Sequence, residues 1–149
     1  MKRPKNPAKE AEYRKRAADL VGQMTLHEKV SQMLSWAPAI ERLGIPAYNW
    51  WSEGIHGIGR AGTATVFPQA IGMAAAFDED MMEQVGNAVG VEARGKYNMC
   101  RAHGDRDIFK GLTVWAPNIN IFRDPRWGRG HETYGEDPFL TSRLGVIFV

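Results

Sequence analysis

Hydrophobic and polar positions follow a helical spacing in four stretches of the chain. We expect helices at residues 8–24, from Leu26 to just before Pro38, from about Glu79 to Tyr97, and from Pro138 onward. Thr25 and Glu28 form a capping-box sequence at the start of the second stretch. Asp78 and Asp137 occupy the N-cap positions of the last two. The spacing and the caps therefore predict four helices.

Two apolar runs interrupt the helical pattern and predict buried strands. They read IGMAAAF at residues 71–77 and LTVWAPNINIF at residues 112–122. A further extended run is expected after Gly44 and Pro46, which both break helices. Alternating helices and strands favour βα units and a parallel sheet, and therefore an α/β fold. About three strands are too few to complete such a fold, so we expect a truncated domain.

Composition narrows the class of protein. The chain has 149 residues, of which 44% are hydrophobic and 24% charged, typical of one soluble globular domain. No apolar run approaches the ~20 residues of a membrane span, so no membrane partner is expected. The basic first 20 residues lack the apolar core of a secretory signal, which predicts a cytoplasmic location. Cys100 is the single cysteine, and no zinc-type spacing of Cys and His occurs.

Charge gives little support for a nucleic-acid partner, since the formal net charge is only +2. Residues 2–16 are locally basic, with seven Lys or Arg against two Glu. Such a run is usually the solvated face of a first helix, although it can also contact RNA or a membrane surface. Binding to RNA or to a charged surface is therefore kept as a third hypothesis.

Candidate chemistry is concentrated in two loops that follow predicted strands, where parallel α/β folds place their ligand sites. The first loop holds Glu53 and His56, and the second reads RDPRWGRGHETYGEDP from Arg123 to Pro138. Glycoside hydrolysis needs two carboxyl groups, one as the acid and one as the nucleophile or base. Composition alone therefore nominates Glu53 with Asp124 or Glu132.

Structural roles explain the same carboxylates equally well. Asp124 precedes a proline and can shape a turn, and Glu132 can pair with Arg126 or Arg129. Trp115 could face a sugar or fill the interior of the sheet. Neither His131-Glu132 nor the HGDRD segment at residues 103–107 matches a known metal-binding spacing, so no metal site is expected.

Three segments carry a family resemblance: MTLHEKVSQML, YNWWSEGIHGIGRAGTATVFPQAIGMAAAFD and KGLTVWAPNINIFRDPRWGRGHETYGEDP. Together they resemble glycoside hydrolase family 3, most closely the branch with bacterial β-xylosidases and β-glucosidases. The likeness runs from about Ala17 to Val149. It implies a (β/α)8 TIM barrel followed by an α/β sandwich domain. On this basis residues 1–149 would be a truncated N-terminal part of the barrel, with its first βα units.

The resemblance also implies an activity: retaining removal of single β-linked sugars from non-reducing ends, without a metal or organic cofactor. Glu53 and Arg129 match the family residues that hold the terminal sugar. The family's lysine–histidine pair, nucleophile and acid/base match nothing in residues 1–149, so we expect no catalytic residue in this chain and no turnover by it. The resemblance therefore sets aside Asp124 and Glu132 as catalytic groups.

Our hypothesis places Glu53 and Arg129 together at the C-terminal edge of the sheet, on one saccharide ligand. Trp50 and Trp51 would wall or support that pocket, and the two charges would offset each other's desolvation. A glutamate at position 53, longer than an aspartate, would crowd the CH2OH group of a hexose and so favours pentosides. The alternative function is a non-catalytic carbohydrate-binding remnant. The oligomeric state is left open.

Overall fold

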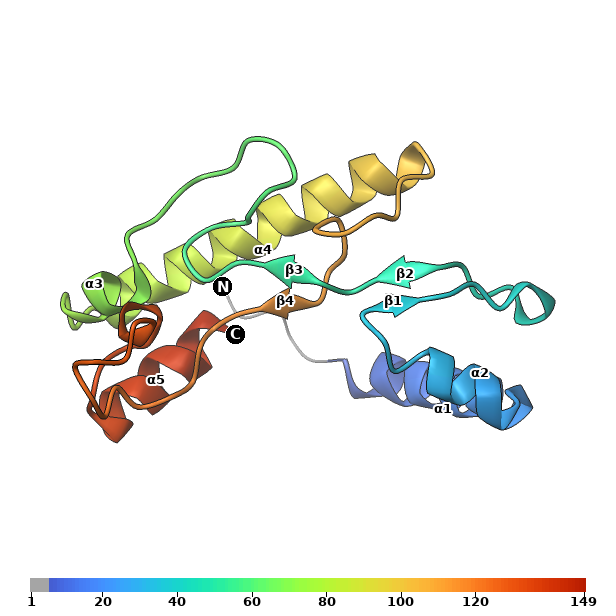
Figure 1. Ribbon diagram of the computed structural model, residues 1–149, viewed down its shortest axis with the longest axis horizontal. Coiled ribbons are helices and arrows are strands. Elements are labelled where there is room, and N and C mark those ends of the chain that lie inside the picture. The colour runs from blue at the N-terminus through green and yellow to red at the C-terminus, as the bar shows by residue number, and fades with distance from the viewer. Residues whose placement is uncertain (1–5) are drawn as a thin grey trace. The chain divides into compact units, whose positions relative to one another are not determined.

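The computed structural model describes residues 6–149, which form two compact units, residues 6–48 and 49–149 (Figure 1). Part of the basic N-terminal run, namely Lys2, Arg3 and Lys5, lies outside the described residues. Within residues 6–149, no helix has the length and apolar character that a membrane crossing requires. Each unit is described separately below.

The first unit consists mainly of helices α1 (Pro7–Gln23) and α2 (Leu26–Ser31). The expected capping box at the start of α2 is confirmed: Thr25 Oγ1 accepts from the Glu28 N–H, and Glu28 Oε2 accepts from the Thr25 N–H. Helix α2 ends earlier than its apolar spacing predicts. A short strand β1 (Trp36–Ala37), a 3-10 turn η1 (Glu41–Leu43) and strand β2 (Tyr48–Asn49) follow, and β1 pairs with β2.

The strand predicted at residues 71–77 is wrong, because this run forms helix α3 (Ala70–Ala74) instead. A short apolar run cannot be assigned to strand or helix from its periodicity alone. Alanine has the highest helix propensity of all residues, and α3 begins at Ala70 and ends at Ala74. Local propensity would therefore have favoured the helix.

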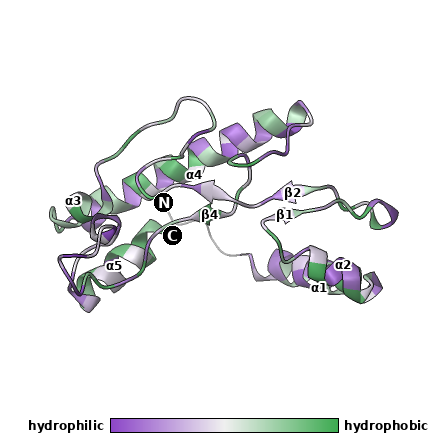
Figure 2. Cartoon of the chain, in the orientation of Figure 1, coloured by the Kyte–Doolittle hydropathy of each residue, from purple (hydrophilic) through white to green (hydrophobic). Residues whose placement is uncertain are grey.

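Helices α4 (Glu79–Ala102) and α5 (Pro138–Phe148) begin at their predicted residues, each capped by the expected aspartate. The buried residues of α4 follow its helical repeat, and hydrophobic and hydrophilic residues both occur along it (Figure 2). The core of the second unit joins α3, α4, α5 and Tyr134, which follows the 3-10 turn η2 (Gly130–Glu132). Its buried members are Ile58, Ala70, Met73, Ala74, Met82, Val85, Val89, Ala93, Tyr134 and Leu144.

A small parallel sheet confirms the α/β class. Strand β3 (Ser52–Glu53) pairs with β4 (Val114–Trp115), in a register that places Glu53 beside Trp115. The strand expected over residues 112–122 is therefore much shorter than predicted. Pro117 follows closely after β4 and has no N–H to continue a ladder. Each strand gives way to a loop at its C-terminal end, and these two loops carry the candidate site.

Candidate functional site

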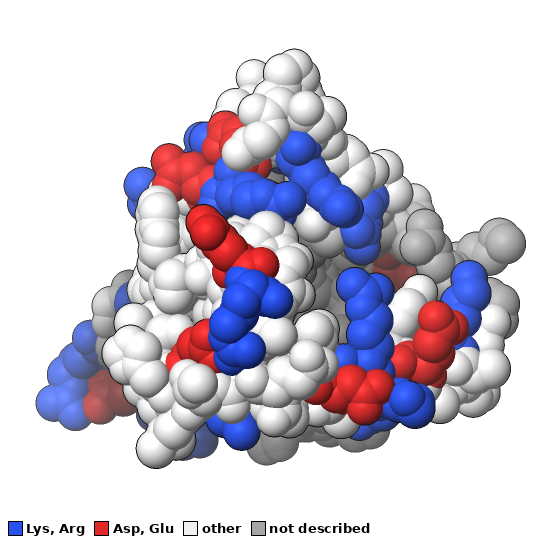
Figure 3. Space-filling model, turned by 90° about the vertical axis from the view of Figure 1, so that its right-hand side faces the viewer, with Lys and Arg blue, Asp and Glu red and all other residues white. Residues whose placement is uncertain are grey.

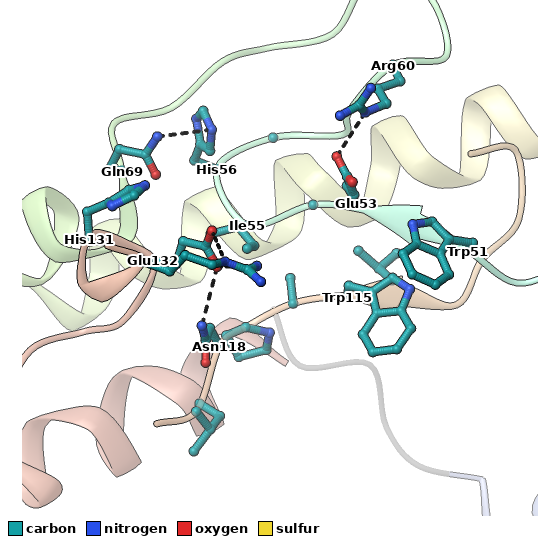
Figure 4. A pocket seen from close by; sticks show the side chains of 17 residues that line it. Trp51, Glu53, Ile55, His56, Arg60, Gln69, Trp115, Asn118, His131 and Glu132 are labelled. Carbon is teal, nitrogen blue, oxygen red and sulfur yellow. Dashed lines mark hydrogen bonds and ion pairs between the residues drawn. The ribbon is translucent and has the colours of Figure 1, made fainter. Parts of the chain in front are cut away.

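The loops that follow β3 and β4 border a cavity of about 860 Å³ in the second unit (Figure 4). Its volume lies within the range typical of small-molecule sites. The polar side chains around it are Glu53, His56, Arg60, Gln69, Asn118, Arg129, His131 and Glu132, and the tryptophans are Trp51 and Trp115. The two loops nominated from the sequence thus meet at one cavity, at the C-terminal ends of two parallel strands.

Glu53 ends β3, and its carboxylate lies beside Arg60. Arg60 Nε donates to Glu53 Oε2 at 3.2 Å, and the glutamate side chain is 43% exposed. The loop after Glu53 folds back toward the end of β3, since the Gly59 N–H donates to the Glu53 carbonyl at 2.9 Å. A Cβ at position 59 would lie 3.3 Å from Glu53 Cβ, so glycine allows this close approach.

Arg129 reaches the cavity from the second loop and is held by Glu132. Its Nε and Nη2 donate to the two oxygens of Glu132 at 2.8 and 2.7 Å. Asn118 Nδ2 lies 3.5 Å from the same carboxylate. The Arg129 guanidinium lowers the pKa of Glu132, which therefore stays ionised and acts as a hydrogen-bond acceptor rather than a proton donor.

Glu53 and Arg129 line the same cavity, but each has another partner. The sequence hypothesis has these two charges offset each other's desolvation; instead Arg60 pairs with Glu53 and Glu132 pairs with Arg129. The pKa of Arg129 is raised mainly by Glu132, and Glu53 adds a smaller electrostatic contribution. Each of the two charges therefore has its own ion-pair partner at the cavity.

Imidazole and amide groups form a second polar wall. His56 Nδ1 lies 2.9 Å from the Phe67 carbonyl oxygen, to which it can only donate, and His56 Nε2 lies 3.5 Å from Gln69 Nε2. His131 points toward the same region (Figure 4). This wall offers both donors and acceptors to a hydroxyl-rich ligand.

Tryptophans form the apolar side of the site. The ring centroids of Trp51 and Trp115 are 5.1 Å apart, and those of Trp50 and Trp115 are 5.8 Å apart. Trp51 is 42% exposed and Trp115 50% exposed, and both border the cavity. Of the two alternatives for Trp115, the structure therefore favours an orientation toward a ligand.

Asp124 does not border the cavity. Its carboxylate accepts from Arg126 Nε and Nη2 at 2.9 and 2.6 Å and from the Arg126 N–H, which is the turn-shaping role left open above. Acidic side chains also lie directly beside basic ones on the face drawn in Figure 3. Within residues 6–149, no three potential metal ligands are grouped closely enough to hold an ion.

Sequence reasoning missed three polar residues of the cavity, Arg60, Gln69 and Asn118. A signal for Arg60 was present, because it is the single cation of the GIGRAG segment and follows Glu53 by seven residues. Gln69 and Asn118 had no comparable signal, since isolated amides are common in loops. Their roles depend on how the two loops fold toward each other.

Residues 16–149 match the family model of the Glycosyl hydrolase family 3 N terminal domain. The chain is 50% identical over 145 residues to probable beta-D-xylosidase 7 of Arabidopsis thaliana, covering 91% of this chain and 18% of that protein. It is 49% identical over 138 residues to a xylan 1,4-beta-xylosidase of Xylanibacter ruminicola. This match covers 91% of this chain and 16% of that protein. The chain thus spans less than a fifth of the length of these relatives.

Solved structures give the same result. A GH3 exo-beta-xylosidase in complex with a xylobiose aziridine probe superposes with a TM-score of 0.73 at 36% identity, covering 90% of this chain and 17% of that chain. A beta-glucosidase from Streptomyces venezuelae in complex with D-glucose superposes with a TM-score of 0.64 at 33% identity. The match covers 90% of this chain and 17% of that chain. The family resemblance found in the sequence is therefore confirmed, and the chain belongs to glycosyl hydrolase family 3.

Proposed function

We propose that this chain is the N-terminal part of a (β/α)8 barrel domain in a retaining, exo-acting β-glycosidase that removes terminal β-linked xylose or glucose. One observation carries the proposal: Glu53 at the end of β3 and Arg129 after β4 border the same cavity. Sites of barrel enzymes lie at the C-terminal ends of the strands. The xylosidase and glucosidase relatives supply the reaction class.

Glu53 and Arg129 are the proposed sugar-binding residues. The ion pair with Arg60 uses Oε2 of Glu53, which leaves Oε1 to accept a bond from a sugar hydroxyl. Arg129 has five N–H donors, of which the contacts with Glu132 use two, and the others can reach hydroxyl oxygens. The exposed indoles of Trp51 and Trp115 suit the apolar face of a sugar ring.

Xylose is the preferred sugar of this proposal. A pentose lacks the CH2OH group of a hexose, and the long side chain of Glu53 borders the cavity together with its ion-pair partner Arg60. Glucose would have to fit its extra carbon beside these two side chains. We therefore expect xylose to bind more tightly than glucose.

A non-catalytic sugar-binding role of this segment is the second candidate. The carboxylates of the described residues that border the cavity are Glu53 and Glu132, and both are paired with arginines. Retaining hydrolysis needs a nucleophile and an acid about 5 Å apart, whereas the pKa of Glu132 is lowered. In both candidate functions this segment binds the sugar. They differ in whether further residues complete a catalytic site.

Titration of the 15N-labelled chain with D-xylose and with D-glucose, followed by NMR, tests the proposal. We expect saturable shifts at the amides of residues 54–57 and 130–132, with a lower Kd for xylose. Glu53→Gln should weaken xylose binding about tenfold, as expected for loss of a charged hydrogen bond. Arg126→Gln is the matched control, since Arg126 contacts Asp124 outside the cavity. Absence of saturable shifts, or unchanged binding by Glu53→Gln, would overturn the proposal.

A saccharide partner, rather than nucleic acid, is part of the same proposal. Two cations of the basic run form ion pairs along α1, Arg14 with Glu10 and Lys15 with Asp19. We expect the chain to leave a heparin column without salt-sensitive retention. Retention that declines steeply with added salt would favour the charged-surface hypothesis instead.

A further inference from the structure

Arg60 has an unusual backbone conformation for its residue type. Its φ is 68°, in the left-handed region that residues with a Cβ rarely adopt. The loop is tightly turned here, since the Gly62 N–H donates to the Arg60 carbonyl at 3.1 Å. Outliers of this kind are retained where the surrounding structure fixes them, and they cluster at functional sites.

The Arg60 side chain lies between a carboxylate and an aromatic ring. Its Nε donates to Glu53 Oε2 at 3.2 Å, and its Cζ lies 5.2 Å from the centroid of the Phe109 ring. Phe109 is itself left-handed, with φ 66°, and its N–H donates to the Trp51 carbonyl at 2.9 Å. Figure 4 shows the Arg60 guanidinium directed toward Glu53. Arg60 and Phe109, whose φ angles are both positive, are thus in contact through the Arg60 guanidinium.

Helix α4 fixes the loop that carries Arg60. Lys96 Nζ donates to the carbonyl of Ala61, the next residue in the chain. Glu92 accepts from the Thr65 N–H at 3.0 Å and from Thr65 Oγ1 at 2.6 Å. The backbone that follows Arg60 is therefore held by a helix of the core.

We infer that Arg60 is a positioning residue, which holds the Glu53 carboxylate so that Oε1 faces a sugar in the cavity; this role rests on the proposed function. The side chains of Arg60 and Glu53 are 65% and 43% exposed, and an exposed ion pair by itself orders its partners only weakly. Contact with the Phe109 ring and the anchoring of the loop to α4 further restrict the Arg60 side chain.

Xylose affinity of the chain and its variants tests this role. Arg60→Gly removes the side chain, and glycine is compatible with φ 68°, so the melting temperature should not fall. We expect Arg60→Gly to weaken xylose binding about fivefold, a typical coupling for residues in contact. Arg60→Lys should recover part of the loss, because it keeps the charge without the planar contact with Phe109. Arg126→Gly, at an exposed arginine outside the cavity, should leave the affinity unchanged.

A double-mutant cycle separates positioning of Glu53 from a general structural effect. In the Glu53→Gln background, Arg60→Gly should change xylose affinity less than twofold. An equal loss in both backgrounds, or unchanged affinity of Arg60→Gly, would overturn the role of Arg60 while leaving the proposed function intact. Failure of the unsubstituted chain to bind xylose would overturn both.

Discussion

Arg129 contacts both carboxylate oxygens of Glu132, with Nε 2.8 Å from Oε1 and Nη2 2.7 Å from Oε2. The two side chains differ in burial, because Arg129 is 70% exposed and Glu132 only 15%. Bidentate pairs of this kind fix the plane of the guanidinium. Glu132 therefore orients Arg129 at the cavity, although composition had nominated it for catalysis.

Removing Arg129 should affect stability as well as sugar binding. In Arg129→Met the mostly buried carboxylate of Glu132 loses its charged partner, which is costly for a desolvated group. We expect a lower urea midpoint than in the unsubstituted chain, with the fold retained. The double variant Arg129→Met/Glu132→Gln should recover most of the midpoint. Equal midpoints for the unsubstituted chain and Arg129→Met would contradict the burial argument.

Gly86 should be intolerant of a side chain. A Cβ at this position would lie 2.5 Å from the carbonyl oxygen of Phe148, so α4 and α5 would have to separate. We expect Gly86→Ala to lower the free energy of unfolding by about 1–3 kcal/mol. Gly90 is the matched control on the same helix, because a Cβ there would meet no atom within 4 Å. Gly90→Ala should instead raise the free energy of unfolding by about 1 kcal/mol, which is the difference in helix propensity between glycine and alanine.

The first unit should depend on pH through Glu28. Hydrogen bonds from Arg42 and from Thr25 lower the pKa of Glu28 from its ordinary value of 4.5 to about 2. Since the folded value is below the unfolded one, the stabilisation is complete above about pH 4.5 and is lost as the pH falls toward 2. In an NMR titration, Arg42→Met should move the Glu28 midpoint toward the ordinary value. An unchanged midpoint would show that Arg42 does not control this carboxylate.

Turnover of aryl β-xylosides by the 149-residue chain should be absent. Glu53 and Glu132 are both paired with arginines, and the lowered pKa of Glu132 prevents it from acting as the acid. Release of the aryl group should therefore equal that of a mock purification. Release above this level that Glu132→Gln abolishes would restore Glu132 as a catalytic candidate.

Local signals in the sequence were sufficient for the N-terminal ends of α2, α4 and α5. The caps at Thr25, Asp78 and Asp137 depend on neighbouring residues only, and all three were predicted correctly. The strands were harder, because their extent depends on pairing between distant segments. Residues 71–74 of one predicted strand lie in helix α3, and β4 is only two residues long.

Local signals located the site residues but did not predict their contacts. The two loops were found from their charged and aromatic residues, and Glu53 and Arg129 do border one cavity. Which arginine pairs with which carboxylate could not be read from the sequence, because the partner of Glu53 depends on a left-handed turn at Arg60. A turn of this kind leaves no periodic signal in the sequence.

The central claim is that one sugar is held jointly by Glu53 and Arg129, and a crystal structure of the chain at saturating D-xylose tests it most directly. The account predicts a pyranose in the cavity, with hydroxyl oxygens about 3 Å from the Glu53 carboxylate and from the Arg129 guanidinium, and with the ring near Trp51 or Trp115. A cavity without sugar at saturation, or a xylose that contacts neither Glu53 nor Arg129, would contradict it.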